Sequence, residues 1–322
     1  MNRRILLGQH AQRYLSERRH LGFQLRSMGH ALRSFTGYVD RLNPCRAVTL
    51  ELMAEWARRD RGHSTDPHTW ARRLKILRPF TRWLQQFEPL TEVPDDTVFG
   101  PVGERLAPHI FSAQEIADLV SAAGRLRPEL RGATYATLFA LLAATGLRVS
   151  EAVHLHNADV DLKAGVLTVR RTKCAKSRHV PLHASALEPL RRYRRLRDRW
   201  ITPTADSPFL VGSRGRRRGE PLSTRQVDRV FASLRTLFGW RNRGAHHAPR
   251  VHDLRHTFVV RRILAWHHSG TDIDQAMLSL STYVGHAMVT NTYWYLTAVP
   301  ELMALAAKKF ESKMGSGRGR HA

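Results

Sequence analysis

The sequence predicts a mainly α-helical protein with one small antiparallel β-sheet, divided into a helical N-terminal domain and a mixed α+β second domain. Apolar residues recur at helical spacing through most of the 322-residue chain, and the period falls from about 3.6 to 2 over residues 159–183. A stretch rich in proline and glycine interrupts the helical pattern at residues 88–108. A chain of this length has room for roughly two domains with cores of ordinary size.

The first domain, residues 1–90, is predicted to be helical. Over residues 21–42, apolar side chains fall at alternating spacings of four and three, which makes one continuous stripe of a helix that should end before Pro44. Thr49 has the residue type of an N-cap and should begin a short helix. A longer helix rich in tryptophan and leucine should follow, with a kink at Pro79.

The second domain, residues 109–311, follows a predicted linker at residues 91–108. A capping box at residues 112–115 should open its first helix, and an apolar helix should stop at Gly146. The segments VLTVRRT and RHVPLH alternate well enough to be strands, and KCAKS at residues 173–177 should be the hairpin loop between them. Helical signals then return and continue to about residue 310.

The charge balance is the strongest global signal, because 52 Lys and Arg face 27 Asp and Glu, a net charge of +25 at pH 7. Counterion release makes nucleic acid the expected partner of such a surface. A membrane is the rival partner, but the basic residues are scattered and no apolar run approaches the ~18 residues of a membrane span. The basic tail, residues 312–322, is expected to be disordered and to lie against phosphates.

Two cysteines far apart, Cys45 and Cys174, make no disulfide framework, which fits a reducing cytoplasm. The first residues, MNRRILLGQHAQRY, lack the apolar core and cleavage site of a signal peptide. A cytoplasmic location is therefore expected.

The segment TGLRVSE places Arg148 two residues after a helix-ending glycine and Glu151 three residues further on. A guanidinium there could fork onto a phosphate while the carboxylate orients it. Taken alone, the heptapeptide is more typical of an ordinary surface Arg–Glu pair.

In HDLRHTF, the side chains of His252, Arg255 and His256 share one helical face. Zinc binding by the two histidines is an alternative, but a general base beside a phosphate-binding arginine explains the mixture better.

Two further features could take part in chemistry at a phosphate. His286 follows Gly285, whose missing side chain permits a tight turn, and Tyr295 comes nine residues later beside Tyr293 and Trp294. A tyrosine becomes a nucleophile only when a base takes its proton and cations hold the electrophile. Taken alone, such an aromatic cluster is usually structural.

The order of these pieces resembles the tyrosine recombinase (phage integrase) family, and is similar to integrases of transposons and genomic islands. The resemblance covers essentially the whole chain and is carried by ATGLRVSE, HDLRHTF and the spacing from VGH to the tyrosine. It implies a helical core-binding domain, a linker and a mixed catalytic domain. By position, it implies the catalytic residues Arg148, Lys173, His252, Arg255, His286 and Tyr295.

The resemblance also implies a role for each residue. Arg148 and Arg255 would clamp the scissile phosphate, with Glu151 in support, and the hairpin Lys173 would protonate the leaving 5′-oxygen. The glycines that often flank the hairpin lysine in the family are threonine and cysteine here, which leaves Lys176 as an alternative.

For the remaining positions, His252 would assist proton transfer and His286 would donate a hydrogen bond to the phosphate. Tyr295 would be the nucleophile, and its spacing from the glycine–histidine pair favours it over Tyr293.

The implied partners are double-stranded DNA at specific recombination sites and three further copies of the chain, which make a homotetramer on two duplexes. The resemblance implies no metal and no cofactor, a bacterial, nucleoid-associated location, and accessory or directionality proteins. It also makes residues 302–310 the candidate for a helix passed to a neighbouring protomer. Two alternatives remain: a DNA-binding accessory factor that does not cut, and a type IB topoisomerase that relaxes supercoils.

Overall fold

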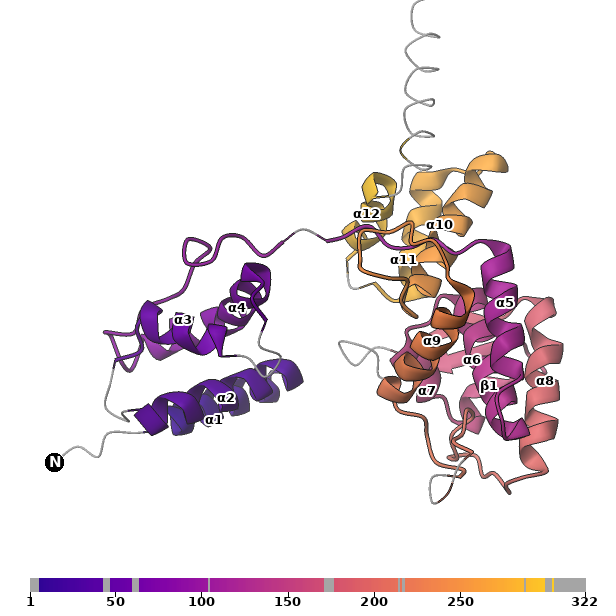
Figure 1. The fold of residues 1–322 in the computed structure, drawn as a ribbon, viewed down its shortest axis with the longest axis horizontal. Helices are drawn as coiled ribbons and strands as arrows, with labels where there is room; N and C mark the ends of the chain where they lie inside the picture. Colours follow the sequence, from indigo (N-terminus) through magenta and orange to yellow (C-terminus); the bar gives the residue numbers. More distant parts are fainter. Residues whose placement is uncertain are drawn as a thin grey trace, which may run out of the picture. The chain divides into compact units, whose positions relative to one another are not determined.

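The computed structural model of this chain forms two compact units, Met1–Arg105 and Leu106–Ala322, each described here by itself (Figure 1). It describes residues 6–42, 47–59, 64–103, 105–170, 177–213, 215, 218–286, 288–298 and 303. The predicted class is confirmed, since the described residues are mostly helical with one small antiparallel sheet. None of the helices in these ranges is long and apolar enough to cross a membrane.

The regular secondary structure in the described residues of the first unit is all helical. Its helices are α1 (Leu7–His20), α2 (Arg26–Leu42), α3 (Leu50–Arg58) and α4 (Pro67–Leu84). Buried aromatic and aliphatic side chains, Phe35, Met53, Trp56 and Phe80 among them, fill the space between these helices. Thr49 caps α3 as predicted, because its hydroxyl accepts a hydrogen bond from the Leu52 amide.

One prediction for this unit is wrong. The apolar stripe over residues 21–42 is not a single helix, because α1 ends at His20 and α2 begins at Arg26. Gly22 and Leu25 have positive φ values of 87° and 44°, which turn the chain between the two helices. Leu21 lies in this turn and is 68% exposed, so its place in the stripe was a coincidence of spacing. The predicted end before Pro44 is consistent with α2 ending at Leu42.

The predicted linker, residues 91–108, is divided between the two units, because the first ends at Arg105 and the second begins at Leu106. Within the first unit, the Arg78 side chain of α4 donates to the Pro94 carbonyl at 2.7 Å and to Asp96 at 2.8 Å. Further on, the Ala107 carbonyl accepts from the Ala245 amide at 2.9 Å in the second unit. Both ends of the predicted linker are therefore held by local hydrogen bonds.

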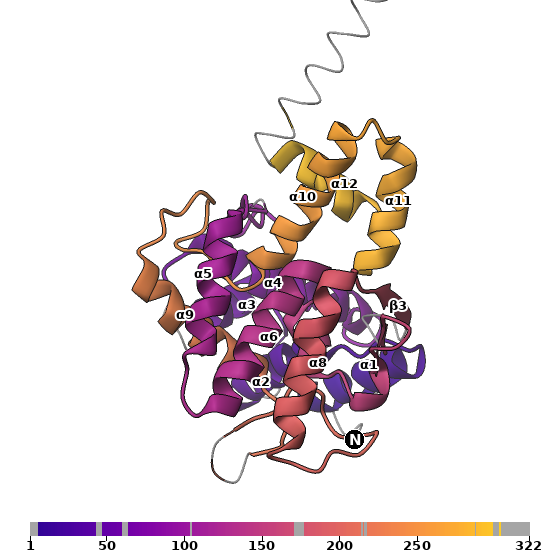
Figure 2. The same cartoon turned by 90° about the vertical axis from the view of Figure 1, so that its right-hand side faces the viewer.

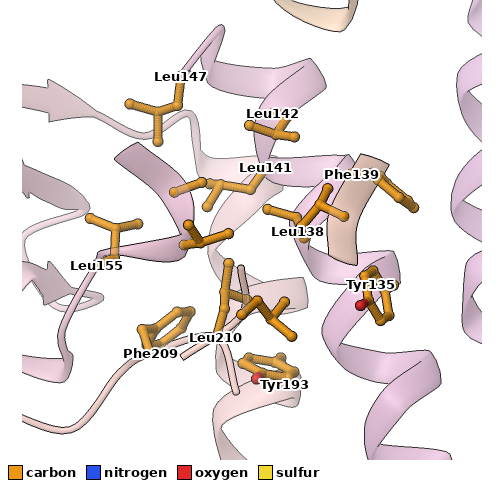
Figure 3. Close-up of a cluster of buried hydrophobic side chains, with 14 of the residues drawn as sticks. Tyr135, Leu138, Phe139, Leu141, Leu142, Leu147, Leu155, Tyr193, Phe209 and Leu210 are labelled. Atoms are coloured by element: carbon orange, nitrogen blue, oxygen red, sulfur yellow. The ribbon is translucent and has the colours of Figure 1, made fainter. Parts of the chain in front are cut away.

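The second unit contains a helical core with a short sheet. Its α-helices are α5 (Ala113–Gly124), α6 (Glu129–Thr145), α7 (Val149–Val153), α8 (Ala184–Asp198), α9 (Thr224–Phe238), α10 (Asp253–His268), α11 (Ile273–Val284) and α12 (Thr290–Ala298). A 3-10 turn, Asn157–Asp159, precedes the sheet. Helix α6 lies between α5 and α8 and also contacts α10 (Figure 2). Side chains of α6 meet Tyr193, Phe209 and Leu210 in the core (Figure 3).

The sheet has the antiparallel order β1 (Val160–Asp161), β2 (Val166–Val169), β3 (Arg178–Pro181). The two predicted strands are β2 and β3, and β1 is an addition that the alternation did not predict. The predicted hairpin loop lies largely at residues 171–176, outside the described residues. The candidate exchanged segment at 302–310, except Met303, and the basic tail also lie outside them.

Two helix boundaries predicted for the second unit, the start of α5 and the end of α6, are confirmed. The Ser112 hydroxyl accepts from the Glu115 amide at 3.1 Å, and the Glu115 carboxylate accepts from the Ser112 amide at 2.7 Å. Gly146 ends α6 with φ 62°, a left-handed conformation that favours glycine. A Cβ there would also lie 2.5 Å from the Phe258 ring, so the turn that precedes Arg148 depends on this glycine.

Candidate active site

Three arginines from distant parts of the sequence donate hydrogen bonds to backbone carbonyls at the C-terminal end of α11. The carbonyl of Tyr283 accepts from Arg178 at 2.8 Å. In the same way, the carbonyl of Val284 accepts from Arg255 at 2.8 Å, and that of Gly285 accepts from Arg148 at 2.9 Å. The last carbonyls of a helix have no partner within the helix, and the helix dipole favours cations at this end. Three guanidinium groups therefore converge immediately before His286.

Arg148 and Arg178 also share one carboxylate. Glu151 accepts from Arg148 at 2.8 Å and from Arg178 at 2.8 and 3.1 Å, and its side chain is only 8% exposed. Its backbone position follows from a reciprocal cap, because the Glu151 carboxylate also accepts from the Arg148 amide at 2.9 Å. Burial by itself raises the Glu151 pKa, but the hydrogen bonds and charges of the two arginines outweigh it and lower the pKa from 4.5 to about 2.

Arg255 is the buried member of the arginine group, with 2% of its surface exposed. Its guanidinium joins two turns, since it donates to the Gly146 carbonyl at 2.7 Å as well as to Val284. Burial, followed by repulsion from Arg148, lowers its pKa from 12.5 to about 10, so it remains charged at neutral pH. Three positive charges here face the single negative charge of Glu151, and the excess favours an anionic ligand.

The two histidines of the predicted site are held by different elements, His252 at the start of α10 and His286 just after α11. His252 precedes α10 and keeps an exposed face, while its ring lies edge-on to His256 with 4.8 Å between centroids. Burial of the rest of the ring, and then the charge of Arg255, lower the His252 pKa from 6.5 to about 4. His252 is therefore neutral at pH 7 and able to accept a proton.

His286 is oriented by α12. Its Nδ1 lies 2.7 Å from the hydroxyl of the buried Thr292, and its amide donates to the Ser281 carbonyl at 2.9 Å. Gly285 makes this turn with φ 71°, and a Cβ there would lie 2.8 Å from the Arg178 guanidinium. The glycine is thus required both for the turn and for the close approach of an arginine.

Tyr295 has no exposed surface and lies in a small apolar core formed by α10, α11 and α12. Its hydroxyl oxygen is 2.6 Å from Nδ1 of His256, itself only 4% exposed. Tyr293 is partly buried at the edge of the same core. The hydroxyl of Tyr295 therefore meets an imidazole from α10, the helix that also carries Arg255.

Five of the six predicted catalytic residues lie in the described part of the second unit, at the start of α7, on or just before α10, just after α11 and within α12. They are Arg148, His252, Arg255, His286 and Tyr295. Lys173 and its alternative Lys176 lie outside the described residues.

Sequence reasoning missed three contributors. Arg178 stands 27 residues from Glu151, and nothing in the sequence pairs Thr292 with His286, so neither contact had a local signal. The third, His256, had a local signal at the i+4 position from His252, but the family resemblance gives it no role of its own.

A stability prediction follows from Glu151. Replacing Glu151 with Gln should lower the free energy of unfolding at pH 7 by about 2 kcal/mol, because Arg148 and Arg178 lose their shared anion. The folded-state pKa of about 2 lies below the ordinary 4.5, so this stabilisation is complete above pH 4.5 and is lost as pH falls toward 2. Urea unfolding at pH 7 and pH 3 would measure the difference, which should be smaller at pH 3.

The matched control is Glu188→Gln. Glu188 pairs with Arg195 on the surface of α8, where both side chains are more than half exposed, so its removal should change stability little. Equal losses for the two variants would contradict the role given to Glu151.

Comparison with known proteins agrees with this geometry. The model of the phage integrase family matches residues 110–301, more than half of the chain. The integrase/recombinase y4rB of Sinorhizobium fredii is 37% identical over 310 residues, which cover 95% of this chain and 97% of y4rB. The tyrosine recombinase XerC of Azotobacter vinelandii is 30% identical over 237 residues, 73% of this chain and 70% of XerC.

Two solved structures share the fold. The Tn1549 transposon integrase in complex with a circular intermediate DNA has a TM-score of 0.64 at 17% identity, covering 91% of this chain and 95% of that one. A lambda integrase dimer bound to a COC′ core site has a TM-score of 0.58 at 19% identity, covering 90% of this chain and 77% of that one. The chain therefore belongs to the phage integrase family of tyrosine recombinases, whose activity is site-specific recombination.

Proposed function

We propose that this recombinase cuts and rejoins double-stranded DNA through a 3′-phosphotyrosyl intermediate, to integrate or excise a mobile element. The observation that carries the proposal is the convergence of Arg148, Arg178 and Arg255 on three successive carbonyls just before His286. Each guanidinium has five N–H donors, so the carbonyl contacts leave capacity for phosphate oxygens. A net charge of +25 favours DNA as the source of that phosphate.

In the proposed reaction, Tyr295 attacks the scissile phosphorus in line and the 5′-oxygen leaves. Arg148 and Arg255 neutralise the nonbridging oxygens, the role that magnesium plays in other phosphoryl transfers. His286 donates a hydrogen bond to the phosphate and His252 assists proton transfer. The leaving oxygen takes its proton from the hairpin lysine, assigned to Lys173 by the family resemblance.

The phosphotyrosyl link conserves the energy of the broken bond, so rejoining needs no ATP. The 5′-hydroxyl of a partner strand attacks the link and releases the tyrosine. Exchange between partners requires two duplexes, and we propose a homotetramer in the bacterial cytoplasm that holds them, with accessory proteins setting direction. The Tn1549 and lambda integrase structures, both bound to DNA, support a DNA substrate.

A nicked suicide duplex that contains the native site tests the chemistry. The wild-type protein should form a covalent adduct on a denaturing gel, attached to the 3′ side of the break, and the new 5′ end should accept phosphate from polynucleotide kinase. A protein that binds this duplex without forming an adduct would be the DNA-binding accessory factor instead.

A second assay separates recombination from topoisomerase activity. A plasmid with two sites should yield exchanged products, whereas a type IB topoisomerase would only relax supercoils. Relaxation without exchange would contradict the proposed recombinase function.

A further inference from the structure

His256 contacts the reacting oxygen of the proposed nucleophile, although the family resemblance assigns it no role. Its Nδ1 lies 2.6 Å from the Tyr295 hydroxyl oxygen, a short distance for this kind of hydrogen bond. Both side chains are buried, at 4% and 0% exposed. His252, the histidine that the family resemblance assigns to proton transfer, reaches this pair through its ring contact with His256.

Burial limits where the phenol proton can go. Bulk water does not touch the Tyr295 side chain in this structure, so the nearest acceptor for the phenol proton is a group in contact with the hydroxyl. The imidazole of His256 is such a group, and a neutral ring with its own proton on Nε2 accepts at Nδ1. A general base must first of all be within hydrogen-bond reach of the proton that it removes, and His256 meets this requirement.

The backbone holds this pair in place. His256 follows Arg255 on α10, and the Arg255 guanidinium is tied to the Gly146 and Val284 carbonyls, which fixes the helix against two turns of the site. Two rings of α12 lie close to the imidazole ring, Tyr295 at 5.5 Å and Trp294 at 6.2 Å between centroids. The imidazole thus extends from the arginine-bearing α10 against the aromatic side chains of α12.

We propose that His256 is a further catalytic residue, which accepts the Tyr295 proton during cleavage and returns it during rejoining. In cleavage, the hydroxyl O–H bond of Tyr295 breaks and an N–H bond forms at His256 Nδ1, while the new O–P bond forms and the bond from phosphorus to the 5′-oxygen breaks. The 5′-oxygen takes a separate proton from the group assigned to it above. In rejoining, the imidazolium returns its proton to the departing phenolate.

This role rests on the proposed phosphotyrosyl chemistry and is tested by two substitutions in the suicide-duplex assay under single-turnover conditions. His256→Asn keeps a group able to accept a hydrogen bond near the position of Nδ1 but cannot take a proton. His256→Phe keeps ring volume and removes both abilities. Both should slow adduct formation by about 100-fold or more, the usual contribution of a general base.

A chemical rescue separates proton transfer from damage to the fold. With 3,5-difluorotyrosine placed at position 295, the phenol is more acidic and needs less help from a base. The His256→Asn protein should then recover at least about tenfold in rate, whereas the protein with native His256 should gain much less. Thermal unfolding of each variant shows whether it is folded.

The matched control is His154→Asn, because His154 is exposed and its Nδ1 contacts the Ser150 carbonyl one turn back on its own helix. It should form the adduct at the wild-type rate. A folded His256→Asn protein that cleaves as fast as wild type, or faster, would overturn the role, as would a slow one that fluorination does not rescue. Failure of the wild-type protein to form any adduct would instead contradict the proposed function.

Discussion

The Tyr295→Phe protein should form no covalent adduct with DNA, whereas Tyr293→Phe should form it at the wild-type rate. The substitution removes the single atom that would attack phosphorus and keeps the ring that fills the core of α10, α11 and α12. The lost hydrogen bond to His256 should cost the fold about 1 kcal/mol, so loss of the adduct would not reflect unfolding. The measurement is the denaturing gel of the suicide duplex, beside a thermal unfolding curve.

Tyr293 is the matched control because it lies two residues away on the same helix and packs at the edge of the same core. An adduct formed by the Tyr295→Phe protein would show that another residue is the nucleophile. Loss of the adduct in Tyr293→Phe alone would transfer the role to Tyr293.

The Arg255→Lys protein should cleave at least about 100-fold more slowly than wild type, since removing one donor of transition-state charge commonly costs about 3–4 kcal/mol. Lysine keeps the charge, but its compact ammonium cannot hold the Gly146 and Val284 carbonyls and also fork onto a phosphate. Single-turnover adduct formation measures the loss, and DNA affinity measured in parallel should change far less.

Arg235→Lys is the control for this substitution. Arg235 also donates to a backbone carbonyl, that of Pro249 at 2.7 Å, but it lies on α9, a helix that carries none of the candidate catalytic residues. Its change should leave the cleavage rate close to that of wild type. A comparable loss in both variants would mean that the Arg255 effect arises from the fold rather than from the phosphate.

The sequence alone determined the features that depend on neighbouring residues. The capping box at Ser112, the glycine stop at Gly146, the cap at Thr49 and the strands β2 and β3 all follow from patterns within a few positions. The order of the arginine, histidine and tyrosine motifs likewise predicted the family, because each motif is a short run of consecutive residues that can be read directly from the sequence. Where spacing misled, at Leu21, two residues with positive φ reversed the chain inside an otherwise regular stripe.

Only the tertiary structure decided how the candidate site is assembled. The meeting of Arg178 with Glu151, the three arginines on the end of α11, and the contact of His256 with Tyr295 join residues from 27 to 137 positions apart. Such contacts depend on how α6, α10, α11 and α12 pack, and packing is set by the shape of a core assembled from the whole unit. The sequence therefore identified Tyr295 as a candidate nucleophile, and its burial against an unassigned histidine could be seen only after folding.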